Sequence, residues 1–440
     1  MVVELVVDRV VAGGAGLAQL DGLKVFVPFS APKDRVRARL TVRKKDYAVA
    51  EVVEVLEPSP IRTAPQCPLY GDCGGCQLQH ISYDGQLVVK KLIVNDSLQR
   101  LGRVFTPVRN ITGETRPWRY RNKTQYPVAG GRRPSIGFFR RQTHDLVDVP
   151  ECLLHPESFD KVRALMLELM LQTGETAYNE KNHSGNVRHL VLRAPDADAD
   201  SGMVATVVTR TRHLAGPIAE GLAAHPSVAG VVHNINPNQT NRIMGAESQS
   251  LSGEANLRFR VLGKDLRCSA GSFFQVNTGQ AEALCRKVLK HAAPEGTENV
   301  LDLYSGVGMI SLVLADFVRS VTGVEQYRPA VRDAEFNAAV NSNQNTRFVR
   351  ADVDSVADSL GDFDIVVLDP PRKGCSPETL RAIAGLRPGR IIYVSCNPAT
   401  LARDLKVLGA MGFQASLIEP VDMFPQTAHV EVVARIEPAA

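Results

Sequence analysis

Apolar and polar positions alternate through the first part of the chain, and turn residues interrupt the alternation. The runs ELVVDRVV and LAQLDGLKVFVPF lie on either side of the glycine-rich AGGAG, and a third strand-rich stretch extends from Val36 to Val55. Runs with a period of two residues, bounded by glycine, predict short β-strands. We therefore expect residues 1–58 to form a small OB-like β-barrel, which ends at the proline-rich sequence EPSP.

The middle of the chain, residues 59–270, mixes helical and strand periodicities. The pattern predicts helices at about 86–101 and 157–172, whereas runs such as HLVLRAP, MVATVVTRT and AGVVHNINP predict strands. The run DADADSG at 196–202 predicts a hairpin or loop. This part is therefore expected to be a central α+β domain.

From about residue 278 onward, short apolar strands alternate with helices. Such an alternation predicts a parallel sheet with helices on both faces. We expect residues 271–440 to form a Rossmann-like, doubly wound domain, so that the whole chain is a multidomain α/β protein. The expected helices lie at 278–293, from 308, and at 328–341, 376–385 and 399–411, and the expected strands are NVLDLY, SVTGVE, RFVRAD, DIVVLDPP, RIIYVSCNP and a final hairpin ending in HVEVVARI.

Composition excludes several classes of protein. No stretch approaches 18 uncharged apolar residues, and the first residues lack the basic start and apolar run of a secretory signal, so neither a membrane span nor a leader is expected. Eight cysteines in 440 residues are too few for a disulfide-stapled secreted domain, which favours the reducing cytoplasm. A net charge of +4 by itself identifies no partner. We expect a monomer without a membrane partner.

The local distribution of charge is more informative. The stretch 116–141 contains eight Lys or Arg and no acidic residue. Cations attract phosphate and aromatic faces stack on unpaired bases, so the stretch predicts nucleic-acid binding; the alternative is a basic surface around a structural core. Arg35, Arg37 and Arg39 make one face of a strand basic, which suits a phosphate backbone or is an ordinary solvated surface. The aromatic residues within 116–141 are Trp118, Tyr120, Tyr126, Phe138 and Phe139.

A glycine turn predicts a nucleotide site. Gly306 and Gly308 follow the strand NVLDLY and precede a helix, where the backbone of an open α/β sheet approaches its ligand. Glu325, at the end of the next strand, can accept both hydroxyls of a ribose, and Asp352, after the third, can meet adenine. The third glycine of a dinucleotide turn is missing, and Asp302 precedes the turn. This favours S-adenosylmethionine over NAD or another nucleotide.

Two further strand ends supply candidate chemistry. Strand four ends in Asp369-Pro-Pro-Arg372 and strand five in the sequence around Cys396, at the same edge of the sheet as the glycine turn. Carbon 5 of uracil is too weakly nucleophilic to take a methyl group unless a thiolate first adds to C6, and a base must then remove the C5 proton. Cys396 is the candidate nucleophile and Glu431 the candidate base. Asp-Pro-Pro also suits an amine methyltransferase, and a noncatalytic RNA-binding or iron–sulfur protein is a third hypothesis.

These motifs together resemble the RNA uracil-C5 methyltransferases, from an N-terminal barrel that is similar to the TRAM domain to the last strand. The resemblance implies that Cys396 is the nucleophile and Glu431 the proton acceptor. It further implies that the cofactor S-adenosylmethionine is bound by Gln275, Tyr304, Glu325 and Asp369, with Asp352. The motifs that carry the resemblance are Cys67-x5-Cys73-x2-Cys76 with Cys152, FFQVN at 273–277, DLYSGVG at 302–308, DPPR at 369–372, SCNP at 395–398 and HVE at 429–431.

The family resemblance also concerns the cysteines and the substrate. In the family four cysteines hold a 4Fe-4S cluster, which implies Cys67, Cys73, Cys76 and Cys152 as its ligands; spacing alone suits zinc equally well. Methyl transfer needs no electron, so the cluster is expected to be structural and RNA-facing. A barrel combined with cluster cysteines resembles the members that act on 23S rRNA, and we therefore predict that substrate, with the T-loop of tRNA as the alternative.

Overall fold

The computed structural model describes residues 1–196, 202–356 and 361–439. The chain forms two compact units. The first unit comprises residues 1–117, 290–292 and 364–440, and the second comprises residues 118–289 and 293–363. The chain thus passes between the units several times, and the boundaries expected at 58 and 270 stay predictions.

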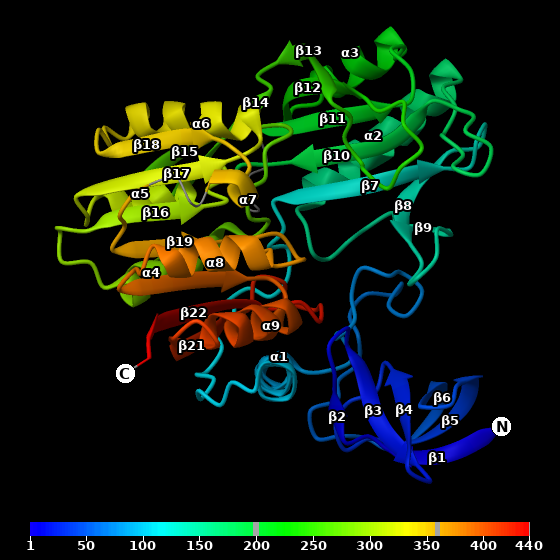
Figure 1. The fold of residues 1–440 in the computed structure, drawn as a ribbon. Helices are drawn as coiled ribbons and strands as arrows, with labels where there is room; N and C mark the ends of the chain where they lie inside the picture. Colours follow the sequence, from blue (N-terminus) through cyan, green and yellow to red (C-terminus); the bar gives the residue numbers. More distant parts are fainter. Residues whose placement is uncertain (197–201, 357–360, 440) are drawn as a thin grey trace. The chain divides into compact units, whose positions relative to one another are not determined.

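The first unit begins with the expected all-β domain, a six-stranded sheet with the order β1-β5-β6-β4-β3-β2 (Figure 1). Alternate strand residues point inward because side chains in a strand alternate between its faces. The fully buried Val25, Val27, Val36 and Ala38 belong to the resulting core. The strands are β1 (Val2–Val6), β2 (Arg9–Val10), β3 (Ala15–Leu20), β4 (Leu23–Pro28), β5 (Arg35–Arg43) and β6 (Tyr47–Glu57).

The basic face of β5 is present, but it is balanced by acids. Arg35 donates to Glu57 (2.8 Å) and to Glu4 (3.0 Å), and Arg37 forms an ion pair with Glu54. These side chains are about half exposed, where ion pairs contribute little to stability. Neighbouring glutamates therefore offset the arginines, which favours the interpretation of this face as an ordinary solvated surface.

The rest of the first unit contains the helix α1, near the expected position, and the strands and helices of the last part of the chain. β19 and β20 are parallel, whereas β22 pairs antiparallel with both β20 and β21. A π-helical turn extends α1, and a Cβ at Gly102 in that turn would lie 2.6 Å from the carbonyl oxygen of Ala402 in α9, so only glycine permits the contact. The elements are α1 (Tyr83–Ser97), η1 (Leu98–Gly102), β19 (Ile365–Leu368), α8 (Pro377–Gly385), β20 (Arg390–Ser395), α9 (Pro398–Gly409), β21 (Phe413–Val421) and β22 (Glu431–Pro438).

Buried polar contacts attach α1 to the segment that precedes β22. Lys90 and Asp422 form an ion pair in which both side chains are fully buried, and the Tyr83 hydroxyl donates to the other oxygen of Asp422 (2.9 Å). The amide of Gln86 donates to Gln426, whose backbone N–H donates back to Gln86 (2.9 Å each). Removing one member of a buried pair leaves an uncompensated charge, so these contacts fix the backbone just before Glu431.

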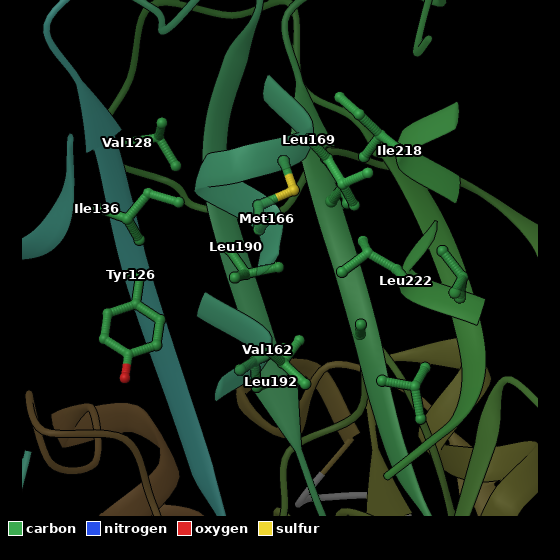
Figure 2. Packing of buried hydrophobic residues seen from close by; sticks show 14 of the residues in the cluster. Tyr126, Val128, Ile136, Val162, Met166, Leu169, Leu190, Leu192, Ile218 and Leu222 are labelled. Carbon is green, nitrogen blue, oxygen red and sulfur yellow. The ribbon is translucent and has the colours of Figure 1, made fainter. Parts of the chain in front are cut away.

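The second unit contains a seven-stranded sheet with the order β13-β12-β11-β10-β7-β8-β9 (Figure 1). Figure 2 shows the core that this sheet forms with the helices α2 and α3, which includes Tyr126 and Leu190 of the sheet and Val162 and Met166 of α2. The elements are β7 (Lys123–Ala129), β8 (Ser135–Phe139), β9 (Leu146–Asp148), α2 (Glu157–Thr173), β10 (Val187–Arg193), β11 (Met203–Thr209), α3 (Gly216–Ala224), β12 (Val228–Ile235) and β13 (Glu247–Gly253). Most of the loop expected at 196–202 lies outside the described residues.

The second unit also holds the beginning of the doubly wound part. β16, β17 and β18 are parallel neighbours, and helices alternate with them as predicted. None of the helices in the described part of the chain has the length and apolar character needed to cross a membrane. The elements are β14 (Asn256–Val261), β15 (Lys264–Ser269), α4 (Thr278–Ala292), β16 (Asn299–Leu303), α5 (Met309–Ala315), β17 (Ser320–Glu325), α6 (Arg328–Val340), β18 (Thr346–Arg350) and α7 (Val353–Val356).

Candidate active site

The glycine turn after β16 has the conformation expected of a ligand-binding turn. Gly306 and Gly308 have φ values of 56° and 84°, and the preceding Tyr304 adopts φ 66° although it carries a side chain. Left-handed backbone costs little for glycine but is strained for tyrosine, and such strain gathers at functional sites. The turn thus bends the chain sharply at the carboxyl end of β16 and leads directly into α5.

Glu325 is held at this turn by two backbone donors. The N–H of Gly306 donates to one carboxylate oxygen (3.2 Å) and the N–H of Tyr327 to the other (2.6 Å). These bonds leave lone pairs on both oxygens, so the carboxylate can still accept a pair of hydroxyls. Gly306 and Glu325 line a cavity of about 290 Å³. The remaining lining residues are Arg242, Met244, Gly245, Ser248, Gly271, Phe273, Tyr327 and Ala330.

A buried carboxylate shapes one side of this cavity. Asp333 of α6 is fully buried and accepts hydrogen bonds from the backbone N–H of Ser269 (2.9 Å), the hydroxyl of Ser272 (2.9 Å) and the guanidinium of Arg267 (3.0 Å). These bonds fix the segment that contains Gly271 and Phe273. A Cβ at Gly271 would lie 2.6 Å from the Tyr327 hydroxyl, so a larger residue there would displace the end of the Tyr327 side chain.

The other residues predicted for the cofactor in this unit do not line the cavity. Gln275 is 4% exposed, and its backbone carbonyl accepts from Asn122 (3.1 Å). Asp352 is exposed, and its carboxylate accepts from the N–H of Asp354 (3.2 Å). The sequence did not point to Tyr327 or to the segment from Arg242 to Ser248, because neither carries a motif. The one available signal for Tyr327 was its place two positions after Glu325, the acid at the end of β17.

The candidate catalytic residues meet in the first unit at the ends of two paired strands. In the antiparallel pair of β20 and β22, Ser395 lies opposite Val432. Cys396 directly follows Ser395, and Glu431 directly precedes Val432, so the two lie next to this last pair of the register. Cys396 is partly buried and Glu431 is 3% exposed. Neighbouring strands lie about 5 Å apart, so the two side chains belong to one site.

The charges of this site act on one another. Burial raises the pKa of the Cys396 thiol to about 11, and the negative charges of Glu431 and Asp369 contribute, against the opposing charge of Arg372. Burial likewise raises the pKa of Glu431 to about 8, again with Asp369 adding to the effect and Arg372 opposing it. Cys396, Glu431, Asp369 and Arg372 are therefore close enough to form one electrostatic group.

Hydrogen bonds fix the segment that carries Asp369 and Arg372 beside the start of α9. The carbonyl oxygen of Arg372 accepts from the side chains of Asn397 (3.1 Å) and Thr400 (3.3 Å). Asn397 also caps α9 by accepting from the N–H of Ala399 (3.1 Å). Cys396 precedes this cap, and the positive end of a helix dipole favours a thiolate, which partly offsets the effect of burial.

The cysteine segment packs on the chain that leads to Glu431. The N–H groups of Gln77 and Leu78 donate to the carbonyl oxygen of Gln426 (3.1 and 3.0 Å), and the N–H of Ala428 donates to the side chain of Gln77 (3.3 Å). A Cβ at Gly14 of the barrel would lie 2.8 Å from the Cβ of Gln77. The barrel, the cysteine segment and the segment before β22 thus support one another within the first unit.

The basic stretch 116–141 has mixed roles. Arg119 donates to the backbone carbonyls of Cys152 and His155 (3.0 Å each), which is a structural role. Phe138 stacks on the fully buried Tyr126 with ring centroids 5.0 Å apart. Arg132 and Arg133 are exposed in the turn between β7 and β8. Part of the predicted nucleic-acid footprint therefore belongs to the core, and part is accessible.

A strand-end glycine turn with a paired carboxylate, followed by strand ends that carry Asp-Pro-Pro-Arg and a cysteine, defines the class of methyltransferases that bind S-adenosylmethionine. Residues 254–437 match the protein family described as tRNA (uracil-5-)-methyltransferase, and residues 3–61 match the TRAM domain of tRNA (uracil(54)-C(5))-methyltransferase. An RNA methyltransferase of Halalkalibacterium halodurans is 39% identical over 99% of this chain and 97% of its own length. The chain belongs to the S-adenosylmethionine-dependent RNA uracil-C5 methyltransferases.

Other relatives agree with this membership. An RNA methyltransferase of Gloeobacter violaceus is 38% identical over 98% of this chain and 95% of its own length. Among solved structures, the tRNA (uracil-54, C5)-methyltransferase of Pyrococcus abyssi in complex with S-adenosyl-L-homocysteine is 29% identical, with a TM-score of 0.78. The match covers 98% of this chain and 100% of that one. The predicted fold class, with a TRAM barrel and a C-terminal methyltransferase domain, is confirmed.

Proposed function

We propose that Cys396 is the nucleophile and Glu431 the base with which this RNA uracil-C5 methyltransferase forms 5-methyluridine. The proposal is supported by the register of β20 and β22, which pairs Ser395 with Val432, the neighbours of Cys396 and Glu431, and by the effect of the Glu431 charge on the Cys396 thiol. An amine methyltransferase, the second hypothesis, would give neither residue a task. The proposal explains why a carboxylate and a thiol are buried together despite the free-energy cost of ionising either of them.

The residues would act in a fixed order. The Cys396 thiol loses its proton to solvent, and the thiolate bonds to C6 of the uracil, so that electron density moves onto C5 and O4. S-adenosylmethionine would supply the electrophilic methyl group that C5 takes up, and its sulfur would leave with the electrons of the broken bond as S-adenosyl-L-homocysteine. Glu431 then removes the proton from C5, the bond between sulfur and C6 breaks, and the C5–C6 double bond forms again. The thiolate is regenerated, and the proton removed from C5 leaves through Glu431.

For the cofactor, we propose that Glu325 accepts hydrogen bonds from the ribose hydroxyls. The two backbone bonds that hold its carboxylate at the lining of the 290 Å³ cavity support this role. Gln275, Tyr304, Asp352 and Asp369 stay predicted contacts that rest on the family resemblance.

For the substrate, we propose a uridine of 23S rRNA, because the barrel together with the cluster cysteines resembles the ribosomal members of the family. A uridine in the T-loop of tRNA is the second candidate. The Pyrococcus abyssi relative favours it, since that protein is a tRNA (uracil-54, C5)-methyltransferase and covers the barrel as well as the rest of this chain. The barrel alone therefore does not discriminate between the two substrates.

Mapping 5-methyluridine in RNA from cells that lack this protein separates the two candidates. We expect one or more 5-methyluridines to disappear from 23S rRNA while those of tRNA persist, and the purified protein to restore them. Loss from the T-loop with intact 23S rRNA would overturn the ribosomal assignment and leave the enzyme class untouched. We also propose that the protein acts in the reducing cytoplasm, because eight cysteines in 440 residues are too few for a disulfide-stapled secreted protein.

We further propose that Cys67, Cys73, Cys76 and Cys152 bind a 4Fe-4S cluster. Among the residues that the structure describes, no group of three or more His, Cys, Asp and Glu side chains is gathered to hold a metal ion. The donor chemistry nevertheless fits a thiolate-bound group: the N–H of Gly75 donates to the sulfur of Cys73 (3.4 Å). Burial and then the neighbouring charge of Cys67 raise the pKa of Cys73, so these two sulfurs lie near each other.

Protein purified without oxygen should contain about four iron and four sulfide per chain. Replacing Cys73 with alanine should remove them and weaken RNA methylation, because the cysteine segment bonds to Gln426 and Ala428 in the chain that leads to Glu431. Zinc in place of iron would contradict the cluster, and a cluster-free Cys73→Ala protein that folds and binds RNA normally would contradict its structural role.

A further inference from the structure

A second cavity, of about 890 Å³, lies in the second unit and shares no lining residue with the cavity at Glu325. It falls within the range of volumes typical of ligand sites. Its walls come from β7, β8 and β10, from the turn at Gly130 and Gly131, and from residues 144–146 and 178–181. The function described above assigns no role to it.

The cavity lies largely on the face of the central sheet that α2 and α3 do not cover. Side chains alternate along a strand, so Phe138 packs on the core while Phe139 lines the cavity. In the same way, Leu190 belongs to the core shown in Figure 2, and the adjacent His189 lines the cavity. The alternation thus directs Phe139 and His189 toward this site, whereas Arg188 lies at an irregularity of β10 between Val187 and His189.

Two flat surfaces form the walls of the cavity. Phe139 stacks on His144, with ring centroids 5.1 Å apart and planes inclined by 30°, and Glu180 accepts a hydrogen bond from His144 (2.6 Å), which holds the imidazole in place. The guanidinium of Arg188 lies over the ring of Tyr178, 4.4 Å from its centroid. Aromatic rings and guanidinium planes are the surfaces on which proteins stack unpaired bases.

Two residues of the lining carry buried polar atoms without a hydrogen-bond partner among the described residues. Arg188 is 3% exposed and donates to the carbonyl oxygens of Asn236 (2.7 Å) and Asn238 (2.6 Å), yet its Nε has no hydrogen-bond partner among the described residues. The buried Nδ1 of His189 likewise has none within that part of the chain. Burial and the charge of Arg188 lower the pKa of His189 to about 4, so its ring is neutral and can both donate and accept.

The lining of the cavity carries balanced charge, and additional cations lie in the turn beside it. Lys181 and Arg188 line it, together with the acidic Asp145 and with Glu180, which is engaged by His144. The exposed Arg132 and Arg133 follow the lining glycines in the turn between β7 and β8. Phosphates that flank a bound base could therefore contact exposed cations while the base itself lies between flat side chains.

We propose that this cavity binds an unpaired base of the substrate RNA, separate from the uridine that is methylated. The proposal rests on RNA being the substrate. It gives the accessible part of the basic and aromatic stretch a function, namely to position the RNA by capturing a second, splayed-out nucleotide. Recognition would come from stacking on Phe139 and His144 and from polar contacts to Arg188 and His189.

Kinetics of the full-length enzyme on unmodified 23S rRNA and tRNA transcripts test the stacking. Phe139→Ala should raise the KM for RNA about 10-fold, because stacking on one aromatic side chain contributes at least a factor of this order. The affinity for S-adenosylmethionine should not change. Phe139→Trp retains a stacking surface and should restore KM to within about twofold. Phe317→Ala, a half-exposed phenylalanine outside the cavity, is the matched control and should behave as wild type.

A photo-crosslink locates the nucleotide directly and does not depend on how well Phe139→Ala folds. With p-benzoylphenylalanine in place of the exposed His144, irradiation should link the protein to a nucleotide other than the methylated uridine. An unchanged KM in Phe139→Ala, no crosslink, or a crosslink to the methylated uridine itself would overturn the proposal. The proposal would also be overturned if millimolar AMP or UMP prevented the crosslink without lowering the affinity of the protein for RNA. That result would indicate a site for free nucleotides. If the enzyme methylates no transcript, the catalytic proposal fails. The crosslink still tests whether this cavity binds a nucleotide of the RNA.

Discussion

Replacing Cys396 with alanine is expected to lower the rate of 5-methyluridine formation by about 10⁴-fold or more. The uracil ring becomes nucleophilic at C5 only while sulfur is bonded to C6, so no other residue of the site can replace the thiolate. Arg372 and Glu431 would remain in place, and binding of RNA and of S-adenosylmethionine should change little. Transfer of labelled methyl groups to RNA, together with separate binding measurements for RNA and cofactor, checks both expectations.

RNA that contains 5-fluorouridine sharpens this test. Fluorine at C5 cannot be removed as a proton, so the wild-type enzyme should become trapped in a methylated covalent adduct that survives denaturation. Cys396→Ala should form no adduct. Cys375→Ala, which alters a buried cysteine of the same unit, should still form it. Retained turnover in Cys396→Ala, or an adduct mapped to another residue, would show that the nucleophile has been assigned incorrectly.

The alternation of strands and helices predicted which candidate residues lie at the ends of parallel strands. In a parallel sheet the carboxyl ends of the strands share one edge, so Asp369 and Cys396 were expected near each other once each was placed at a strand end. Glu431 belongs to a final antiparallel strand, and its position depends on register. No local pattern fixes the register between β20 and β22, and the structure supplies it.

Burial was harder to predict than position. Tyr126 and Phe138 look like base-stacking residues in the sequence, but both pack in the core on α2 and α3, whereas Phe139 faces the 890 Å³ cavity. Sequence alternation shows that neighbouring residues point to opposite faces, but not which face the helices cover. Asp333 was missed for a related reason, since an acid within a helix usually lies in solvent and here forms the buried centre of a hydrogen-bond network.

Replacing Glu431 with glutamine is expected to trap the reaction one step later than Cys396→Ala. Glutamine fills the same space but cannot remove the C5 proton, so methyl transfer proceeds and the bond between sulfur and C6 is not broken. Turnover should fall by about 10²- to 10⁴-fold, and an adduct carrying the new methyl group should accumulate on ordinary uridine RNA. Mass spectrometry of the protein–RNA complex detects it. Free 5-methyluridine produced at the wild-type rate would exclude Glu431 as the base.

The pH dependence of the same variant tests the environment of Glu431. Its pKa of about 8 means that the carboxylate form, which acts as the base, becomes more populated as the pH rises through 8. The rate of product release by the wild-type enzyme should therefore increase up to that pH and then level off. The rate of adduct decay in Glu431→Gln should not change with pH in this range.

The stability of the folded protein should show the opposite trend. The folded protein binds this proton more tightly than the unfolded chain, whose glutamate titrates near 4.5. Wild-type stability therefore decreases between about pH 4.5 and 8 relative to the glutamine variant. Thermal melting of both proteins across that range measures the difference, and parallel curves would show that Glu431 is not buried as an acid.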